Sequence, residues 1–148
     1  KPVPYINIMD RHYAAVHHED FNNMVAWLRE FYRKNGWITW TAETYDCDVF
    51  SLDVTYWFGK AAWASGYNIQ PAVATLVVQQ NHAFGGVPAD PGTHAVVGAI
   101  VWRWNADQSW PVWELLVGEP QEILTYGSMR MVPLSEYPNP ILSIQAAR

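Results

Sequence analysis

Hydrophobic positions early in the chain repeat at helical spacing. Over residues 18–36 the apolar side chains recur about every 3.6 residues, which predicts an amphipathic helix. We expect Asp20 to be its N-cap and Gly36 to end it after a basic last turn. The periodic positions are Phe21, Met24, Leu28 and Phe31.

A second helical pattern begins at Cys47 or Asp48 and runs to about Ser65, with Gly66 as its stop. The helix carries aromatic side chains on all sides, so we expect it to be buried in the middle of the domain. Residues 37–46, between the two helices, have a mixed pattern and are expected to be extended or looped. The broad apolar face consists of Phe50, Val54, Trp57, Phe58 and Ala61.

After Gly66 the pattern becomes that of β-strands. Valine-rich runs predict strands over 71–79, 93–104 and 112–118, and the last two read as a hairpin around a polar turn. Shorter strands are expected near 128–132 and 141–145. Two helices followed by an antiparallel meander indicate an α+β fold, with the second helix packed against the sheet.

The composition of the chain argues against some classes of function. A chain of 148 residues, half of them hydrophobic, is expected to form one globular domain over 1–148. The net charge of −5 argues against a nucleic-acid partner. No apolar run is long enough for a membrane span, and the start of the chain has no signal-peptide pattern. Neither localisation nor oligomeric state follows, so a homo-oligomer or a larger assembly stays open.

The single cysteine lies in the stretch TYDCDVF, between Asp46 and Asp48. Neighbouring carboxylates disfavour a thiolate and would make Cys47 less reactive. The N-terminus of a helix has the opposite effect, because its free N–H groups and dipole stabilise negative charge. Cys47 is therefore either a small core residue or a nucleophile that needs a base and a residue to orient that base.

His94 and Glu119 are the candidates for these two roles. His94 lies at the start of the predicted strand 93–104. Glu119 directly follows the predicted strand 112–118, which pairs with 93–104 in the hairpin. Antiparallel pairing brings the start of one strand beside the end of the next, so both side chains should lie at one end of the sheet. Glu114 and Glu122 compete with Glu119 for the orienting role.

Three segments together resemble a known family. They are YDCDVF before a helix, GVPADPGTHAVVGAI at the start of a strand, and VWELLVGEPQEI at the end of the next. Their order and spacing resemble the papain-like cysteine protease domain in the C-terminal half of Marasmius-type mushroom agglutinins and in related small bacterial and phage proteins. The resemblance covers roughly residues 37–145. It implies a papain-like fold in which Cys47 is the nucleophile, His94 its base and Glu119 the orienting residue.

The same resemblance implies a calcium ion bound by aspartates beside the cysteine. Here the ligands would be Asp46 and Asp48 with Glu43, although Val49 stands where the family usually has another aspartate. Helix capping by the two aspartates is the alternative.

Papain-like enzymes complete the oxyanion hole with an upstream side chain, typically Gln. No Gln precedes Cys47, and Trp40 and Thr41 occupy about that offset. Two functions remain open: a thiol hydrolase acting on a peptide or protein substrate, and a non-catalytic binding or structural module on the same fold, such as a phage-particle or agglutinin-like protein. Aromatic residues could line a substrate cleft in the first case; they include Trp37, Trp40, Trp102, Trp104 and Trp110.

Overall fold

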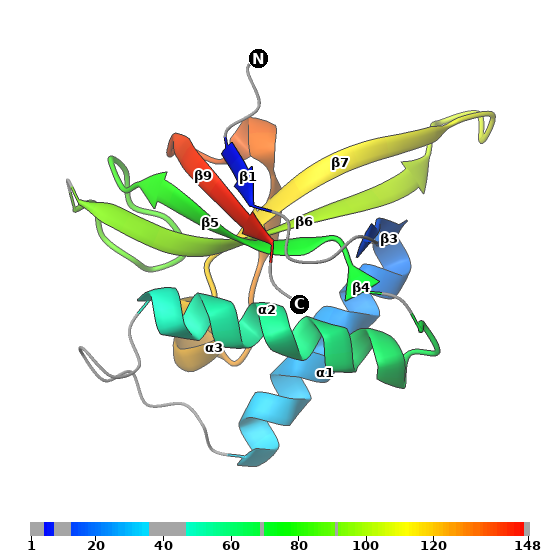
Figure 1. The fold of residues 1–148 in the computed structure, drawn as a ribbon, viewed down its shortest axis with the longest axis horizontal. Coiled ribbons are helices and arrows are strands. Elements are labelled where there is room, and N and C mark those ends of the chain that lie inside the picture. Colours follow the sequence, from blue (N-terminus) through cyan, green and yellow to red (C-terminus); the bar gives the residue numbers. More distant parts are fainter. Residues whose placement is uncertain (1–4, 8–12, 36–46, 69, 91, 147–148) are drawn as a thin grey trace.

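The computed structural model describes residues 5–7, 13–35, 47–68, 70–90 and 92–146. Short strands come first along the chain, then two long helices, and then mainly strands (Figure 1). In chain order they are β1 (Tyr5–Asn7), β2 (Tyr13–Ala14), β3 (Val16–His17), α1 (His18–Asn35), α2 (Cys47–Ala64), β4 (Gln70–Pro71), β5 (Val73–Gln79), β6 (Thr93–Trp104), β7 (Pro111–Gly118), α3 (Gln121–Tyr126), β8 (Met131–Pro133), a 3₁₀ turn (Leu134–Glu136) and β9 (Ile141–Ala146).

The main sheet has seven strands. Strands β5, β6, β7 and β8 follow one another as an antiparallel meander, and β9 adds to the free side of β5. Strand β1 pairs with β9 and β3 with β6, both in parallel, while β2 and β4 form a separate pair. The α+β class predicted from the sequence is confirmed.

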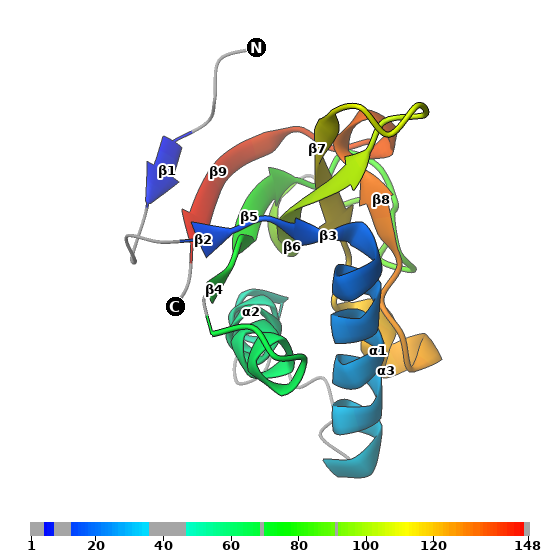
Figure 2. The same cartoon turned by 90° about the vertical axis from the view of Figure 1, so that its right-hand side faces the viewer.

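Both long helices lie against one face of this sheet (Figure 2). The rings of Phe21 on α1 and Phe58 on α2 stack at 5.1 Å between centroids, and Val97 from β6 joins the same buried cluster. Neighbouring residues of a strand point to opposite faces, so Val96 belongs to a second cluster on the far face. The sheet is therefore covered by helices on one side and by strand and turn residues on the other.

Helix α1 differs from its prediction in two details. It begins at His18, so Asp20 lies inside the first turn and is not the N-cap. The Asp20 carboxylate instead accepts a hydrogen bond from the hydroxyl of Tyr67, which follows α2 and is 47 residues away along the chain. Tyr32 is fully buried, whereas Phe31 is only partly buried.

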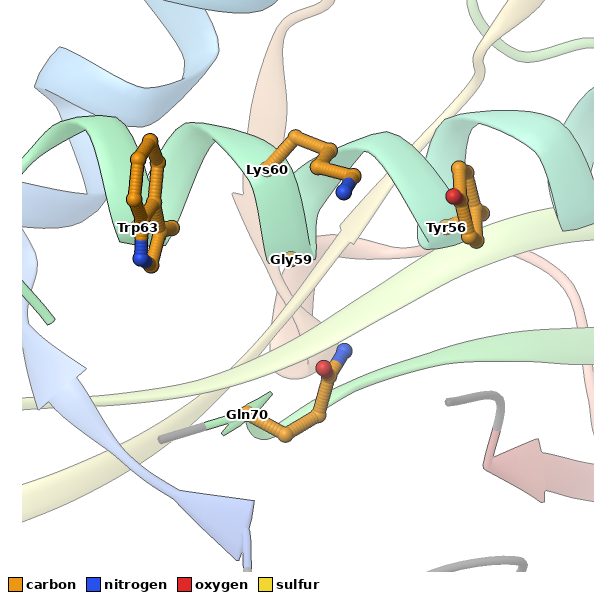
Figure 3. A pocket seen from close by; sticks show the side chains of 5 residues that line it. All are labelled: Tyr56, Gly59, Lys60, Trp63 and Gln70. Atoms are coloured by element: carbon orange, nitrogen blue, oxygen red, sulfur yellow. The ribbon is translucent and has the colours of Figure 1, made fainter. Parts of the chain in front are cut away.

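Helix α2 begins at Cys47, as predicted, and Gly66 follows it with a φ of 89°, a conformation that suits glycine. The expectation that it is buried on all sides is wrong. One face carries the buried residues Phe50 and Val54, but Tyr56 and Trp63 on the other face are 49% and 74% exposed (Figure 3).

The predicted hairpin is confirmed, with β6 and β7 paired from Val97–Gly118 to Trp104–Pro111. Strand β8 starts at Met131, later than predicted, because helix α3 occupies the chain directly after β7. Trp104 and Trp110 are exposed on this hairpin, 48% and 72% respectively, away from the cavity of Cys47 described below. Trp37 and Trp40 lie outside the described residues.

Candidate active site

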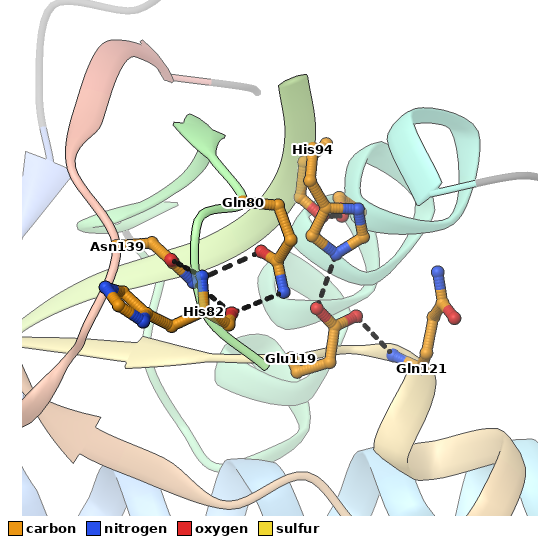
Figure 4. A network of polar contacts seen from close by, with 8 residues as sticks. Gln80, His82, His94, Glu119, Gln121 and Asn139 are labelled. Carbon is orange, nitrogen blue, oxygen red and sulfur yellow. Dashed lines mark hydrogen bonds and ion pairs between the residues drawn. The ribbon is translucent and has the colours of Figure 1, made fainter. Parts of the chain in front are cut away.

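His94 and Glu119 form a short hydrogen bond at the base of the β6–β7 hairpin. Nε2 of His94 lies 2.6 Å from Oε2 of Glu119 (Figure 4). The histidine is 9% exposed and the glutamate is fully buried. His94 is the second residue of β6, and Glu119 comes directly after β7, so antiparallel pairing brings both to the same end of the sheet, as the sequence predicted.

Glu119 is held from a second side. Its other carboxylate oxygen, Oε1, accepts a hydrogen bond of 3.1 Å from the backbone N–H of Gln121 at the start of α3. The backbone of Gly85 lies against the Glu119 side chain, so closely that a Cβ on residue 85 would lie 2.8 Å from Glu119 Cγ. The carboxylate is therefore fixed in position by α3 and by the loop that precedes β6.

Cys47 is the first residue of α2 and lies on the other side of His94. Both residues line one cavity of about 410 Å³, and the Cys47 side chain is partly exposed. Ser51, one turn further along α2, donates a 3.0 Å hydrogen bond to the carbonyl of Ala95, the residue after the histidine. This bond joins the first turns of the helix to the strand, and so sets the distance between the thiol and the imidazole.

The charge state of His94 is set by these neighbours. Burial alone would lower the pKa of its imidazole, but side-chain hydrogen bonds with Cys47 and Glu119, together with their charges, raise it to about 9. Nε2 faces Glu119, which leaves Nδ1 as the ring nitrogen for Cys47. At neutral pH the arrangement therefore favours the imidazolium form of His94, which would stabilise negative charge on the neighbouring sulfur.

The competing glutamates are not bonded to the histidine. Glu114 lies within β7 with its carboxylate 4.0 Å from Arg103 Nε. Glu122 is buried on α3, and burial is the main cause that raises the pKa of its carboxyl group. Glu119 is the one of the three that meets His94.

A buried amide network supports the loop before His94. Asn139 accepts a 2.7 Å hydrogen bond from the backbone N–H of His82 and donates to Gln80 Oε1 at 3.3 Å. Gln80 in turn bonds through its backbone to Gly92 and Asp90, which bridges the two ends of the loop. Sequence reasoning missed this network, because its two amides are 59 residues apart and neither follows a recognisable motif.

Several predicted residues fall outside the part of the chain that the structure describes. Trp40, Thr41, Glu43 and Asp46 lie in the segment 36–46, and of Asp48 only the helical backbone is described. The predictions of an oxyanion-hole side chain and of a calcium site therefore stay predictions. Within the described ranges no cluster of three or more His, Cys, Asp or Glu side chains could hold a metal ion.

Comparison with family models and with curated proteins adds no relative. None of the family models matches this chain, and no curated protein matches it. Within the described ranges, no helix has both the length and the apolar character needed to span a membrane. The functional interpretation therefore rests on the geometry around Cys47 and on the short motifs of the sequence.

Proposed function

We propose that the protein is a thiol hydrolase, a cysteine peptidase or amidase, whose nucleophile is Cys47. The observation that carries the proposal is the position of His94, hydrogen bonded to a fully buried carboxylate and, on its other side, to the only cysteine of the chain. A nucleophile, a base and a residue that orients the base are what this chemistry requires.

The reaction begins when the Cys47 thiolate attacks the carbonyl carbon of a peptide or amide bond. Negative charge moves to the carbonyl oxygen, where the backbone N–H groups at the start of α2 can stabilise it. His94 then donates its Nδ1 proton to the leaving nitrogen, the C–N bond breaks, and an amine departs. The acyl group remains on Cys47 as a thioester.

The second half restores the enzyme. Neutral His94 takes a proton from a water molecule, and the resulting hydroxide attacks the thioester carbonyl. The carbon–sulfur bond breaks, the carboxylic acid leaves, and the thiolate–imidazolium pair forms again. Throughout, Glu119 keeps the ring oriented and stabilises its positive charge, while its own two oxygens stay bonded to His94 and to Gln121.

The sequence resemblance supports a papain-like arrangement for this site. Cysteine, histidine and glutamate occur in that order, on a helix, at a strand start and after the next strand, as in the family. Calcium binding by Asp46, Asp48 and Glu43 is a separate proposal, and the steps above use only the chain's own residues. Thr41 or Trp40 would add a hydrogen-bond donor or shape the oxyanion hole.

One observation favours the alternative, a non-catalytic binding module. Trp110 and Trp113 on the β6–β7 hairpin are 72% and 63% exposed, which is typical of an interaction surface. Such a surface would serve an assembly or a larger partner whether or not Cys47 reacts. The test below separates the two functions because it measures the thiol itself.

The test is the rate of alkylation of Cys47 by iodoacetamide across a pH series. We expect a midpoint below the value of about 8.5 for free cysteine, because the imidazolium and the helix N-terminus stabilise the thiolate. His94→Ala should shift the midpoint upward and slow alkylation at neutral pH. His82→Ala is the matched control, since His82 is an exposed histidine of the preceding loop.

The proposal fails if Cys47 alkylates as free cysteine does and His94→Ala changes nothing. A second measurement is the release of acid-soluble peptides from casein by the wild-type chain and by Cys47→Ala. Activated alkylation together with casein cleavage that Cys47→Ala abolishes supports a peptidase. Activated alkylation without cleavage of casein leaves an amidase with a narrower substrate.

A further inference from the structure

A second cavity lies along the exposed face of α2, on the side of β4. It measures about 390 Å³ and is lined by Tyr56, Gly59, Lys60, Trp63 and Gln70 (Figure 3). Its walls combine two exposed aromatic rings, one ammonium group and one amide. None of these residues takes part in the triad.

The amide of Gln70 is the strongest sign of a ligand. Its Nε2 atom is buried, yet it has no hydrogen-bond partner among the described residues. A buried donor without an acceptor is rare and unfavourable unless something else supplies the acceptor. Figure 3 shows this side chain extending from β4 toward α2, where the ammonium and the aromatic rings lie.

The helix is built to let this amide approach. A Cβ on residue 59 would lie 3.1 Å from Gln70 Oε1, which is closer than ordinary contact. Glycine inside a helix is unfavourable by roughly 0.5–1 kcal/mol relative to alanine. Gly59 therefore weakens α2 locally and in exchange opens the space in which Gln70 sits.

The chemistry of the walls specifies an acidic ligand. The ammonium of Lys60 pairs with no carboxylate within the described ranges, so it is free for an anionic group. Gln70 lines the same cavity, so a turn of its amide would bring the unpaired Nε2 to such a carboxylate. Tyr56 and Trp63, on either side of Lys60, offer flat surfaces for the apolar atoms beside such a group.

This cavity lies one helical turn further along α2 than the one that contains Cys47. Leu52 lines the first cavity and Tyr56 the second, one helical turn apart, which is about 6 Å along the axis. Leu52, Tyr56, Lys60 and Trp63 are spaced by four, four and three residues and are all exposed, so they form one stripe along α2. The stripe leads away from the thiol along the helix.

We propose that this stripe is a substrate-binding groove, and that the second cavity is a subsite for an acidic residue of an extended polypeptide substrate. The inference rests on the proposed hydrolase function and adds its substrate class. Lys60 lies 13 positions after Cys47, or about 20 Å along the helix. An extended chain covers roughly 3.3 Å per residue, which places the acidic residue about six positions from the bond that is cleaved.

The test measures binding without turnover, on the full chain carrying Cys47→Ala. The probe is a fluorescein-labelled peptide of Glu-Tyr-Gly repeats, compared by fluorescence polarisation with its Gln-Tyr-Gly counterpart. The repeat places a carboxylate near Lys60 in any register. We expect the acidic peptide to bind roughly five-fold more tightly at low ionic strength, with the difference shrinking as salt is added.

Two pairs of variants locate the contact. Lys60→Glu should abolish the preference for glutamate, whereas Lys34→Glu, the same charge change at the exposed end of α1, should leave it intact. Trp63→Ala should weaken binding of both peptides, whereas Tyr126→Ala removes a similarly exposed aromatic ring, 65% against 74%, without effect. A preference that survives Lys60→Glu, or that Lys34→Glu removes equally, overturns the proposal.

Three other combinations of results would decide between the subsite proposal and the hydrolase proposal. Binding of an oligogalacturonate that depends on Lys60, with no binding of the acidic peptide, would overturn the polypeptide assignment in favour of an acidic sugar. If Cys47 alkylates as free cysteine while the Lys60-dependent preference holds, the hydrolase proposal fails and the groove stands as a binding site. If Cys47 is activated and the preference is missing, the subsite alone fails.

Discussion

Gly85 offers a test of how the fold positions the orienting carboxylate. Its φ is 60°, a left-handed conformation, and its backbone lies against Glu119. An alanine at residue 85 would bring Cβ to 2.8 Å from Glu119 Cγ, and nearer still to Glu119 Cβ. Carbon atoms prefer about 3.5 Å or more, so the Glu119 side chain must move by more than about 0.7 Å.

The neighbouring glycine provides the control. Gly86 has a φ of 80°, and a Cβ there would meet only Tyr126, at 3.6 Å, which is ordinary contact. Gly86→Ala should therefore lower the free energy of unfolding only by the cost of a Cβ in the left-handed conformation, about 1–2 kcal/mol. Gly85→Ala should add overpacking of about 1–3 kcal/mol to this penalty. The difference between the two variants measures the contacts of a Cβ at residue 85, the tightest of which are with Glu119 and the next with Glu122 at 3.1 Å.

Gly85→Ala should also change the reactivity of the Cys47 thiol. Displacing Glu119 lengthens its 2.6 Å bond to His94, and the imidazolium loses part of its support. Gly85→Ala should therefore shift the pH midpoint of Cys47 alkylation upward, while Gly86→Ala leaves it in place. Urea unfolding gives the stabilities, and iodoacetamide gives the midpoints. Equal destabilisation by the two alanines, or an unchanged midpoint in Gly85→Ala, would refute the reasoning.

Three further predictions use simpler changes. Cys47→Ala should lower the free energy of unfolding by about 1 kcal/mol or less, because a partly exposed thiol beside a cavity leaves little void; a loss of about 2 kcal/mol in urea unfolding would indicate a packed core residue instead. The pKa of His94 is raised to about 9, so its stabilising contribution is complete below about pH 6.5 and is lost as the pH rises towards 9. Urea unfolding of wild type and His94→Gln should therefore show a gap that narrows over this interval; a gap that widens contradicts the assignment. Millimolar calcium should raise the melting temperature if Asp46 and Asp48 bind it, and replacing both by Asn should remove the rise. An unchanged melting curve would favour helix capping.

The parts of the site that follow local rules could be predicted from the sequence. Cys47 was placed at a helix start because apolar periodicity begins there, and the helix does begin there. His94 and Glu119 were placed together because the ends of paired antiparallel strands meet, and their side chains are 2.6 Å apart. Each of these inferences depends on one element or one hairpin, where periodicity and pairing geometry determine the outcome.

Contacts between distant segments could not be predicted. The Gln80–Asn139 pair and the packing of Gly85 on Glu119 depend on where loops return to the sheet, which no local pattern specifies. The exposed face of α2 was misread for a related reason. Aromatic residues on all sides of a helix predict burial, but Tyr56 and Trp63 are amphipathic side chains that can line a wet cavity as well as a core.

The buried pair of His94 and Glu119 is itself an argument for function. Removing two charged groups from water is unfavourable, and well-packed apolar residues of the same size usually stabilise a fold as much or more. Stability therefore gives no reason for this pair to lie at the end of β6 and β7, where β5 and β8 already supply an apolar core. The pair does have an electrostatic consequence. The two aspartates that flank Cys47 oppose a thiolate, and an imidazolium held by a fully buried carboxylate is what offsets them. A buried pair that offsets the acidic neighbours of Cys47 is what the proposed thiol hydrolase requires and what stability alone does not explain.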